Sequence, residues 1–361
     1  MTTDSGYMSI ETAANKWKIS HRRVQTLCSE LRIPGAIFIG NMWILPNNTV
    51  KPIDARTLDY KLSSISGIKP FVKWSGGKGQ LLRSIERMSP KGLGVEITKY
   101  AEPFVGGGAV LFNFLRKYHF DEVYISDVNK ALIETYKTIR DSLEDLKELL
   151  YNYQSKYSSM EEKTKRDYYY SMRTKYNEII TKDVIQDEVE LSALFIFLNK
   201  TCFNGVYRVN ASGEFNVPPG VYKNPTICDE ENLDKISLVL ETVNIECRDY
   251  HDSLNFMDER TFAYFDPPYR PLSLKNTFVG YTASTFDDNS QYELANFIKK
   301  IDSKGVKFLL SNSDPKNTNP NDDFFEELYS KYSISRVGAM RTINSNAEKR
   351  GRVSELLINN Y

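Results

Sequence analysis

The 361-residue sequence contains few of the residues from which metal sites and disulfide frameworks are built. Its 3 histidines lie far apart in the chain, so a histidine-based metal site or catalytic triad has little material. The 4 cysteines have no paired spacing that would indicate disulfide bonds or a zinc site. The sequence therefore predicts reduced thiols and no bound metal.

Long hydrophobic runs are absent as well. The longest, residues 191–198, is far shorter than the ~20 residues that a membrane-spanning helix needs. The N-terminal segment is polar and lacks the apolar core of a secretory signal. We therefore expect a cytoplasmic protein without a membrane partner.

No charge of one sign prevails, because 47 Lys and Arg residues balance 47 Asp and Glu residues. Net charge therefore argues neither for nor against a polyanionic partner. Hydrophobic residues make up 41% of the chain and charged residues 26%, which is typical of globular proteins with a sizeable core. At this length we expect one large domain and a smaller one.

The N-terminal segment predicts two helices followed by a β-hairpin. Ser9 and Ser20 are typical N-cap residues, and each precedes an amphipathic segment, the second of which extends to Leu31. Apolar runs then flank a Gly-Asn turn at residues 40–41, and Pro46 ends the second run.

This order of elements resembles the winged helix-turn-helix modules of MerR and excisionase type, whose second helix enters the major groove of DNA. The resemblance implies a DNA-binding module over residues 1–50, with Arg22 and Arg23 in contact with DNA. The same pattern also fits a small amphipathic helical cap or a protein-docking module. Residues 51–68 are polar with little apolar periodicity and predict a linker.

After the linker, strand-like apolar runs alternate with helical stretches. The runs are residues 99–103, 123–127, 243–247, 261–266 and 306–311. Such alternation predicts an α/β fold, with a mainly parallel sheet covered by helices. Residues 143–222 interrupt the alternation and predict a mainly helical insert, so that residues 69–142 and 223–361 together form the sheet domain.

The strongest single motif is Asp266-Pro267-Pro268-Tyr269, at the end of a predicted strand. Two prolines cannot continue a β-ladder, so Asp266 is expected at the carboxyl end of the strand, where open α/β sheets bind ligands. A carboxylate, a carbonyl oxygen and an aromatic ring then project from one rigid unit. Such a unit suits an aromatic amine, because two acceptors on the amino hydrogens draw the nitrogen lone pair out of conjugation. The motif also fits an ordinary proline-stiffened turn.

A second motif, EPFVGGG, spans residues 102–108 after another predicted strand. Its glycines let the backbone approach a ligand closely, which predicts a bound nucleoside cofactor. Asp127 ends the next strand about 20 residues later, where an acid commonly binds ribose hydroxyls. Trp74 and Lys78 flank a Gly-Gly turn and suit a cofactor that carries an adenine and a carboxylate. Considered alone, Trp74 fits a core residue and Lys78 a surface charge.

Together and in this order, the motifs resemble the Dam-type family of DNA adenine methyltransferases, the α group of the D12 class. The resemblance covers about residues 69–360 and includes the segments NKTCFNGVYRVNASGEFNVPPGVY, FLLSNSD and F-x-x-Y-x-x-x-x-F, which starts at Phe278. It implies a Rossmann-like catalytic domain that uses S-adenosylmethionine as cofactor. It also implies an adenine flipped out of double-stranded DNA, because the N6 atom lies inside the duplex stack.

The resemblance also implies roles for individual residues. Asp266 and Pro267 bind the amino group, and Tyr269 stacks on the flipped adenine. The catalytic residues are Asp266, Pro267, Pro268 and Tyr269. The cofactor site is lined by Trp74, Lys78, Glu102, Pro103, Phe104, Gly106, Gly108, Asp127 and Asp266.

The insert, residues 143–222, is expected to be a target-recognition domain, since residues 199–222 resemble a hairpin that reads DNA at GATC or related sites. The expected DNA contacts are Lys73, Asn204, Arg208, Asn210 and Asn216. Val221 stands where a basic residue is often found and Pro219 where an aromatic is common, so the resemblance does not identify the recognition sequence.

Two other classes of function fit part of the pattern. Transfer to cytosine N4 or to a protein amide uses a similar tetrapeptide, although an aspartate at position 266 favours adenine. A DNA-binding regulator with a cofactor-sensing methyltransferase fold would not require the complete tetrapeptide that is present. For a site-specific enzyme, a cognate restriction endonuclease encoded nearby is a candidate partner.

Overall fold

The structure is a computed structural model that describes residues 6–17, 19–29, 33, 35–40, 42–47, 49, 65–182, 186–270, 286–340 and 352–361. The chain divides into two compact units, Met1–Ser64 and Ile65–Tyr361. The linker was expected to end at residue 68. Ile65 and Ile68 are instead buried in the second unit, because both are apolar side chains that its core can accommodate.

The first unit packs two helices, α1 (Ile10–Trp17) and α2 (His21–Ser29), with a small antiparallel sheet. Both predicted caps are present, since Ser9 Oγ accepts the amide of Thr12 at 3.1 Å and Ser20 Oγ accepts the amide of Arg23 at 3.2 Å. Leu31 lies outside the described residues.

The small sheet has the order β1 (Tyr7–Ser9), β3 (Met42–Pro46), β2 (Ile37–Ile39). The hairpin of β2 and β3 was predicted. Strand β1 was not, because three residues ahead of a helix carry too short a pattern to distinguish a strand from a loop.

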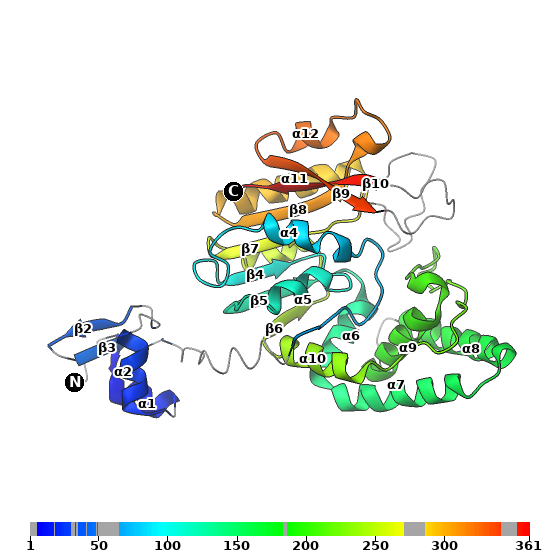
Figure 1. Ribbon diagram of the computed structural model, residues 1–361, viewed down its shortest axis with the longest axis horizontal. Helices are drawn as coiled ribbons and strands as arrows, with labels where there is room; N and C mark the ends of the chain where they lie inside the picture. Colours follow the sequence, from blue (N-terminus) through cyan, green and yellow to red (C-terminus); the bar gives the residue numbers. More distant parts are fainter. Residues whose placement is uncertain are drawn as a thin grey trace. The chain divides into compact units, whose positions relative to one another are not determined.

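The second unit contains a mixed sheet of seven strands (Figure 1). Five neighbouring strands are parallel, which confirms the predicted α/β class with a mostly parallel sheet. Of the last two strands in the sheet, one pairs antiparallel with the parallel part and the other pairs antiparallel with that strand at the edge. In sheet order the strands are β6 (Val243–Glu246), β5 (Glu122–Ser126), β4 (Lys99–Glu102), β7 (Thr261–Phe265), β8 (Lys307–Ser313), β10 (Arg352–Asn359) and β9 (Ser333–Met340).

Alternate residues of the central strands face opposite sides of the sheet. Tyr100 and Phe262 point to the side covered by α5 (Ala109–Leu115), where their rings lie 5.5 and 5.3 Å from the ring of Phe114. Ala101 and Ala263 point to the other side, into the core cluster that includes α11 (Asp288–Ser303). Both faces of the strands are therefore buried, and the polar residues that end them are left at the edge.

Three consecutive helices form a lobe beside the β6 edge of the sheet (Figure 1). They are α7 (Leu143–Ser158), α8 (Glu162–Ile180) and α9 (Glu188–Thr201). Helix α9 is buried on nearly all sides, because it packs against α7, α8 and α6 (Lys130–Asp141). The chain then continues through irregular structure and two isolated β-bridges, Cys202 with Pro219 and Val209 with Phe215, to α10 (Glu230–Leu240).

Shorter elements complete the second unit. They are α4 (Leu82–Arg87), α12 (Phe324–Leu328) and the 3-10 turns Lys78–Gln80, Phe203–Gly205, Tyr250–Asn255 and Pro315–Asn317. Within the described ranges, no helix combines the length and the apolar character that crossing a bilayer requires.

Candidate active site

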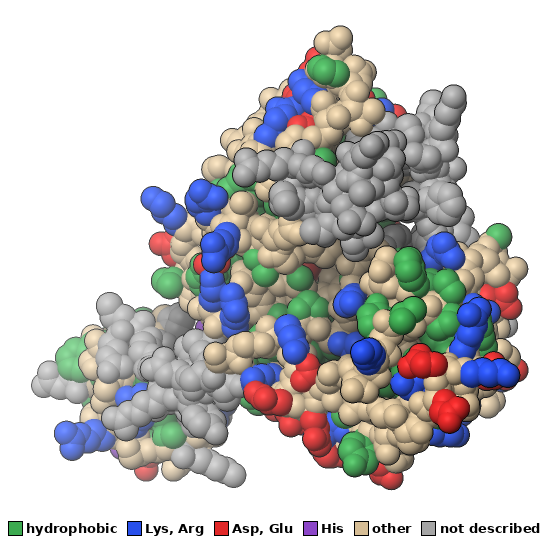
Figure 2. Space-filling model, turned by 45° about the vertical axis from the view of Figure 1, so that its right-hand side comes forward, with side chains coloured by type: hydrophobic (Ala, Val, Ile, Leu, Met, Phe, Trp, Pro, Cys, Tyr) green, Lys and Arg blue, Asp and Glu red, His purple; other side chains and the backbone are tan. Residues whose placement is uncertain are grey.

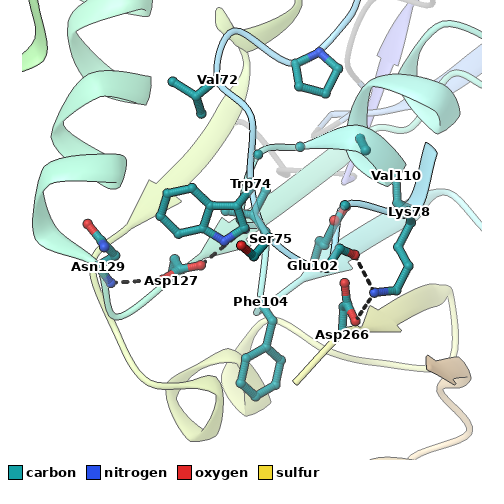
Figure 3. A pocket seen from close by; sticks show the side chains of 18 of the residues that line it. Val72, Trp74, Ser75, Lys78, Glu102, Phe104, Val110, Asp127, Asn129 and Asp266 are labelled. Atoms are coloured by element: carbon teal, nitrogen blue, oxygen red, sulfur yellow. Dashed lines mark hydrogen bonds and ion pairs between the residues drawn. The ribbon is translucent and has the colours of Figure 1, made fainter. Parts of the chain in front are cut away.

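A pocket of about 1320 Å³ opens where β4, β5 and β7 end. The segments that follow these strands line it, together with residues 68–79 and part of residues 200–206. Its lining includes every sequence-predicted catalytic and cofactor residue, as well as Lys73 and Asn204. Figure 3 shows Trp74, Asp127 and Asn129 at one end of the pocket and Lys78, Glu102 and Asp266 at the other.

Asp266 directly follows β7, as the two prolines predicted. Its Oδ1 lies 2.7 Å from Lys78 Nζ and accepts the hydroxyl of Ser311, on the neighbouring strand β8, at 2.9 Å. Burial raises the pKa of Asp266 above its ordinary value, while Lys78 and Ser311 act against this shift. Two neighbouring side chains thus fix the carboxylate at the carboxyl end of β7.

Lys78 is a buried residue, with 4% of its surface exposed. Its ammonium group donates to the carbonyl oxygen of Gly76 at 2.7 Å and lies 4.6 Å from the centre of the Tyr269 ring. This position excludes the alternative of a surface charge. It places a cation between the carboxylate and the aromatic ring of the Asp266–Tyr269 unit.

Tyr269 is held by β10, which pairs antiparallel with β8 in the same sheet. Its hydroxyl donates to Glu355 Oε2 at 2.6 Å. Burial and the nearby carboxylates raise the pKa of Tyr269 well above its ordinary value, so the hydroxyl stays a donor. No sequence motif indicates Glu355, because its contact with Tyr269 depends on the antiparallel pairing of a strand far along the chain. Ser311 lies within the FLLSNSD segment, whose pattern does not indicate a role for an individual residue.

Glu102 ends β4 and is almost completely buried. Its Oε2 accepts the hydroxyl of Tyr100 at 2.6 Å. Burial raises the pKa of Glu102 well above its ordinary value, and the charge of Asp266 adds to this effect. Two carboxyl groups therefore share one end of the pocket with the single ammonium group of Lys78.

The glycine turn packs tightly against Trp74. Gly106 has a positive φ of 49°, and a Cβ at this position would lie 2.7 Å from Trp74 Cδ1. Its amide donates to Asp127 Oδ2 at 3.1 Å, while Asp127 Oδ1 accepts the amide of Asn129 at 2.9 Å. Burial raises the pKa of Asp127. Gly108 also has a positive φ, of 76°, and a Cβ there would overlap the hydroxyl of Tyr136.

The predicted reading hairpin has an internally bonded structure. Arg208 Nε donates to Asn216 Oδ1 at 2.7 Å, so Asn216 orients the guanidinium group. Asn210 closes the tip, because its Oδ1 accepts the amides of Ser212 and Glu214. Arg208, Asn210 and Asn216 lie outside the pocket lining, whereas Asn204 lies within it and is held at a positive φ of 58°.

The other predicted DNA contacts are distributed over both units. Arg22 and Arg23 lie on α2, in the first unit. In the second unit, Lys73 has its ammonium group 5.6 Å from the centre of the Tyr222 ring. Figure 2 shows Lys and Arg side chains around the hollow between the sheet and the helical lobe, and the pocket lining includes Lys69, Lys73, Lys78, Arg116 and Lys200. Phe278, which begins the F-x-x-Y-x-x-x-x-F segment, lies outside the described residues.

A sheet with parallel central strands and a pocket over their carboxyl ends defines the class of α/β enzymes that bind ligands at this edge. Comparison with known proteins identifies the family within this class. Residues 74–343 match the family of D12 class N6 adenine-specific DNA methyltransferases, and the chain belongs to this family. The predicted activity, adenine-specific DNA methylation, is thereby confirmed.

Individual relatives align over most of their length. The chain is 47% identical over 296 residues to the Type II methyltransferase M.MjaIII of Methanocaldococcus jannaschii, covering 81% of this chain and 99% of the relative. It is 36% identical to the Type II methyltransferase M1.LlaDCHI of Lactococcus lactis subsp. cremoris, over 81% and 96% of the two chains. It is 32% identical to the DNA adenine methylase of Escherichia coli K12, over 80% and 94%.

Proposed function

We propose that this chain transfers the methyl group of S-adenosylmethionine directly to the N6 atom of an adenine in double-stranded DNA. One observation carries the proposal. A single pocket is lined by Asp266, Pro267 and Tyr269 and also by Trp74 and Asp127. An arrangement of amino-group acceptors beside a nucleoside-sized site is what a direct transfer requires, since both reactants must be held in contact.

The end of the pocket formed by Trp74, Gly106 and Asp127 fits the cofactor. Asp127 is partly exposed there, and its carboxylate can accept ribose hydroxyls besides the two backbone amides that it already binds. The indole of Trp74 offers an aromatic surface for the cofactor adenine, and Gly106, which has no side chain, lets the glycine turn pack directly against that indole. When bound, S-adenosylmethionine supplies an electrophilic methyl group on a sulfonium centre.

The opposite end of the pocket fits the target amino group. Asp266 uses Oδ1 for Lys78 and Ser311, which leaves Oδ2 for one amino hydrogen. In this proposal the carbonyl oxygen of Pro267 accepts the other. These contacts draw the nitrogen lone pair out of conjugation with the ring and direct it toward the methyl group. The Tyr269 ring, fixed by Glu355, stacks on the adenine after it is flipped out of the duplex.

The helical lobe and the hairpin supply the DNA contacts in this proposal. Residues 143–222 form the target-recognition domain, with the hairpin at residues 199–222 reading a GATC-like or related site through Arg208. The first unit acts as a winged helix-turn-helix module that binds DNA through Arg22 and Arg23. As Type II methyltransferases are among its relatives, a cognate restriction endonuclease is the proposed partner.

Replacing Asp266 tests the proposed reaction. Asp266→Ala is expected to lower the rate of tritiated methyl transfer to adenine-containing duplex DNA by about 100-fold or more, in the range found when one preorganised group is removed from a site that stabilises developing charge. The single variant removes the ion-pair partner that lies 2.7 Å from the buried Lys78, which is destabilising. The double variant Lys78→Met with Asp266→Ala removes that charge.

The pair of variants separates chemistry from folding. Both are expected to show this loss of methyl transfer, and the double variant is expected to melt at a higher temperature than the single one. Near-normal transfer by either variant would contradict the proposed role of Asp266.

A further inference from the structure

Asn199 lies in the last turn of α9 and is 2% exposed. Its Oδ1 accepts the backbone amide of Lys73 at 2.8 Å. Its Nδ2 donates to the carbonyl oxygens of Lys73 at 2.9 Å and of Gly205 at 3.2 Å. A single buried amide group thus joins the segment that precedes Trp74 to the beginning of the hairpin.

The two joined segments also touch through their side chains. Gly205 has a positive φ of 66°, and a Cβ at this position would lie 2.5 Å from Lys73 Cδ. Two residues further on, the ring of Tyr207 is stacked on Trp74, with centroids 5.5 Å apart and planes inclined by 19°. Lys73 and Trp74 are therefore in contact with the hairpin through both backbone and side chains.

Trp74 is also in contact with the proposed cofactor end of the pocket, and Lys73 belongs to the pocket lining. Trp74 lies so close to the glycine turn that neither Gly106 nor Gly107 could carry a Cβ without displacing it. The amide of Gly106 in turn binds Asp127. Lys73 and Trp74 thus form a segment shared by the hairpin and the cofactor pocket.

We propose that Asn199 is a positioning residue that couples DNA binding at the hairpin to cofactor binding in the pocket. This inference rests on the proposed function. DNA seated on the hairpin fixes Gly205 and Tyr207, and Asn199 passes that constraint to Lys73 and Trp74, so the cofactor meets an ordered site. Because coupling between two binding sites is reciprocal, bound cofactor must also strengthen DNA binding by the same factor.

Asn232 provides a matched control within the chain. It lies on α10, is 5% exposed, and binds the backbone of Lys69 in the way that Asn199 binds Lys73. Its Oδ1 accepts the Lys69 amide and its Nδ2 donates to the Lys69 carbonyl oxygen, both at 3.0 Å. Neither of these two described hydrogen bonds involves the hairpin. Replacing it should therefore loosen the pocket segment without breaking the connection to Gly205.

The test compares cofactor affinity with and without DNA in the full-length protein. The probes are S-adenosylhomocysteine and a duplex with the sequence that the wild-type enzyme methylates in cells. Calorimetry of the wild type should give a dissociation constant for S-adenosylhomocysteine that falls about fivefold or more with saturating duplex, the lower part of the usual range for coupled sites. This ratio is expected to fall to about 1 in Asn199→Ala and to keep its wild-type value in Asn232→Ala.

Asn199→Asp serves as a second variant, since it keeps an acceptor for the Lys73 amide but loses the donor to the carbonyl oxygens of Lys73 and Gly205. It should also lose the coupling. A wild-type ratio near 1, a wild-type ratio in either Asn199 variant, or equal losses in the Asn199→Ala and Asn232→Ala proteins would overturn the inference. A wild type that neither binds S-adenosylhomocysteine nor methylates adenine would instead contradict the proposed function, so the two failures are distinguishable.

Discussion

At the residue scale, the carboxylate of Asp266 is subject to two opposing influences. Burial favours its neutral form, whereas the ammonium group of Lys78, 2.7 Å away, favours the ionised form. The net pKa of Asp266 is raised. An acid with a raised pKa is ionised only above that pKa. Activity that needs the carboxylate is therefore full above the pKa of Asp266 and is lost as the pH falls through this pKa.

The first prediction concerns Lys78→Met. Without the ammonium group, the pKa of Asp266 should rise further, and the acid limb of the profile of kcat/KM against pH should move to higher pH. Lys78→Arg keeps a cation and should leave the limb near its wild-type position. Glu102→Gln tests the assignment, because the limb should remain if it belongs to Asp266 and disappear if it belongs to Glu102. A limb at the same pH in Lys78→Met and the wild type would contradict the prediction.

A second prediction at this scale concerns Asp127. Asp127→Ala should weaken cofactor binding by ~1–3 kcal/mol, the usual cost of leaving a buried hydrogen-bonding group without its partner. Calorimetry with S-adenosylhomocysteine measures the loss. Because Asp127 also accepts the amides of Gly106 and Asn129, Asp127→Asn, which keeps one carbonyl oxygen, should retain more of the affinity and of the melting temperature. Unchanged affinity in the alanine variant would remove Asp127 from the cofactor site.

At the scale of elements, local sequence patterns predicted the bounds of a strand best where the strand and the residues that end it form one short, continuous segment. The Asp266-Pro267-Pro268 segment marks the end of β7 by backbone chemistry alone, and residues 123–127 differ from β5 by a single position at each end. The antiparallel pair β9 and β10 was not predicted, because its pairing depends on tertiary contacts with β8. The role of Glu355 depends on that same register, whereas Ser311 reaches Asp266 through the parallel pairing of β7 with β8.

For the hairpin, the sequence pattern predicted the kind of structure but not the contacts within it. Its glycines, prolines and polar residues predicted a turn-rich reader, but the pattern could not show which side chains hold the hairpin together. Asn210 binds the backbone of the tip, and Asn216 binds Arg208. Sequence spacing alone left all three as equivalent candidates for DNA contacts.

The prediction for the hairpin concerns the variant Arg208→Ala. If the guanidinium group, oriented by Asn216, pairs with a guanine edge, the variant should lose ~1–3 kcal/mol of discrimination at one base position. Methylation rates on cognate and singly substituted duplexes measure this. Arg173→Ala is the control, because Arg173 lies on α8 and donates to the hairpin backbone at Val217.

The alternatives for Arg208 have different signatures. A phosphate contact would weaken binding to all sequences alike and reduce the salt slope by about one unit. A purely structural arginine would lower the melting temperature without altering site preference, as expected for Arg173. Unchanged preference, salt slope and melting temperature would remove Arg208 from the reader.

At the scale of the whole molecule, the two units differ in their relation to the family. The family model begins at Trp74, and the alignments with relatives leave out about a fifth of this chain while covering nearly all of the relatives. The unit Met1–Ser64 therefore lies outside the matched family region. It has its own core, built around residues such as Trp17, Val24 and Leu27.

The last prediction is that this unit adds DNA affinity without setting the methylated sequence. The deletion should end at residue 64, because Ile65 and Ile68 are buried in the second unit and their loss would disturb its core. The truncated enzyme should bind DNA more weakly and with a flatter dependence on salt, since each lost phosphate contact no longer releases a counterion. In the full chain, replacing both Arg22 and Arg23 by alanine should reduce the salt slope by about two units if both bind phosphate.

Methylation mapping of DNA from cells that express the truncated enzyme distinguishes the possible outcomes. The same methylated sequence at a lower rate is the expected result, because the proposed reader lies wholly in residues 199–222. A changed methylated sequence would show that the first unit takes part in reading. Unchanged DNA affinity and salt slope would favour the protein-docking alternative, in which the exposed Arg22 faces a partner other than DNA.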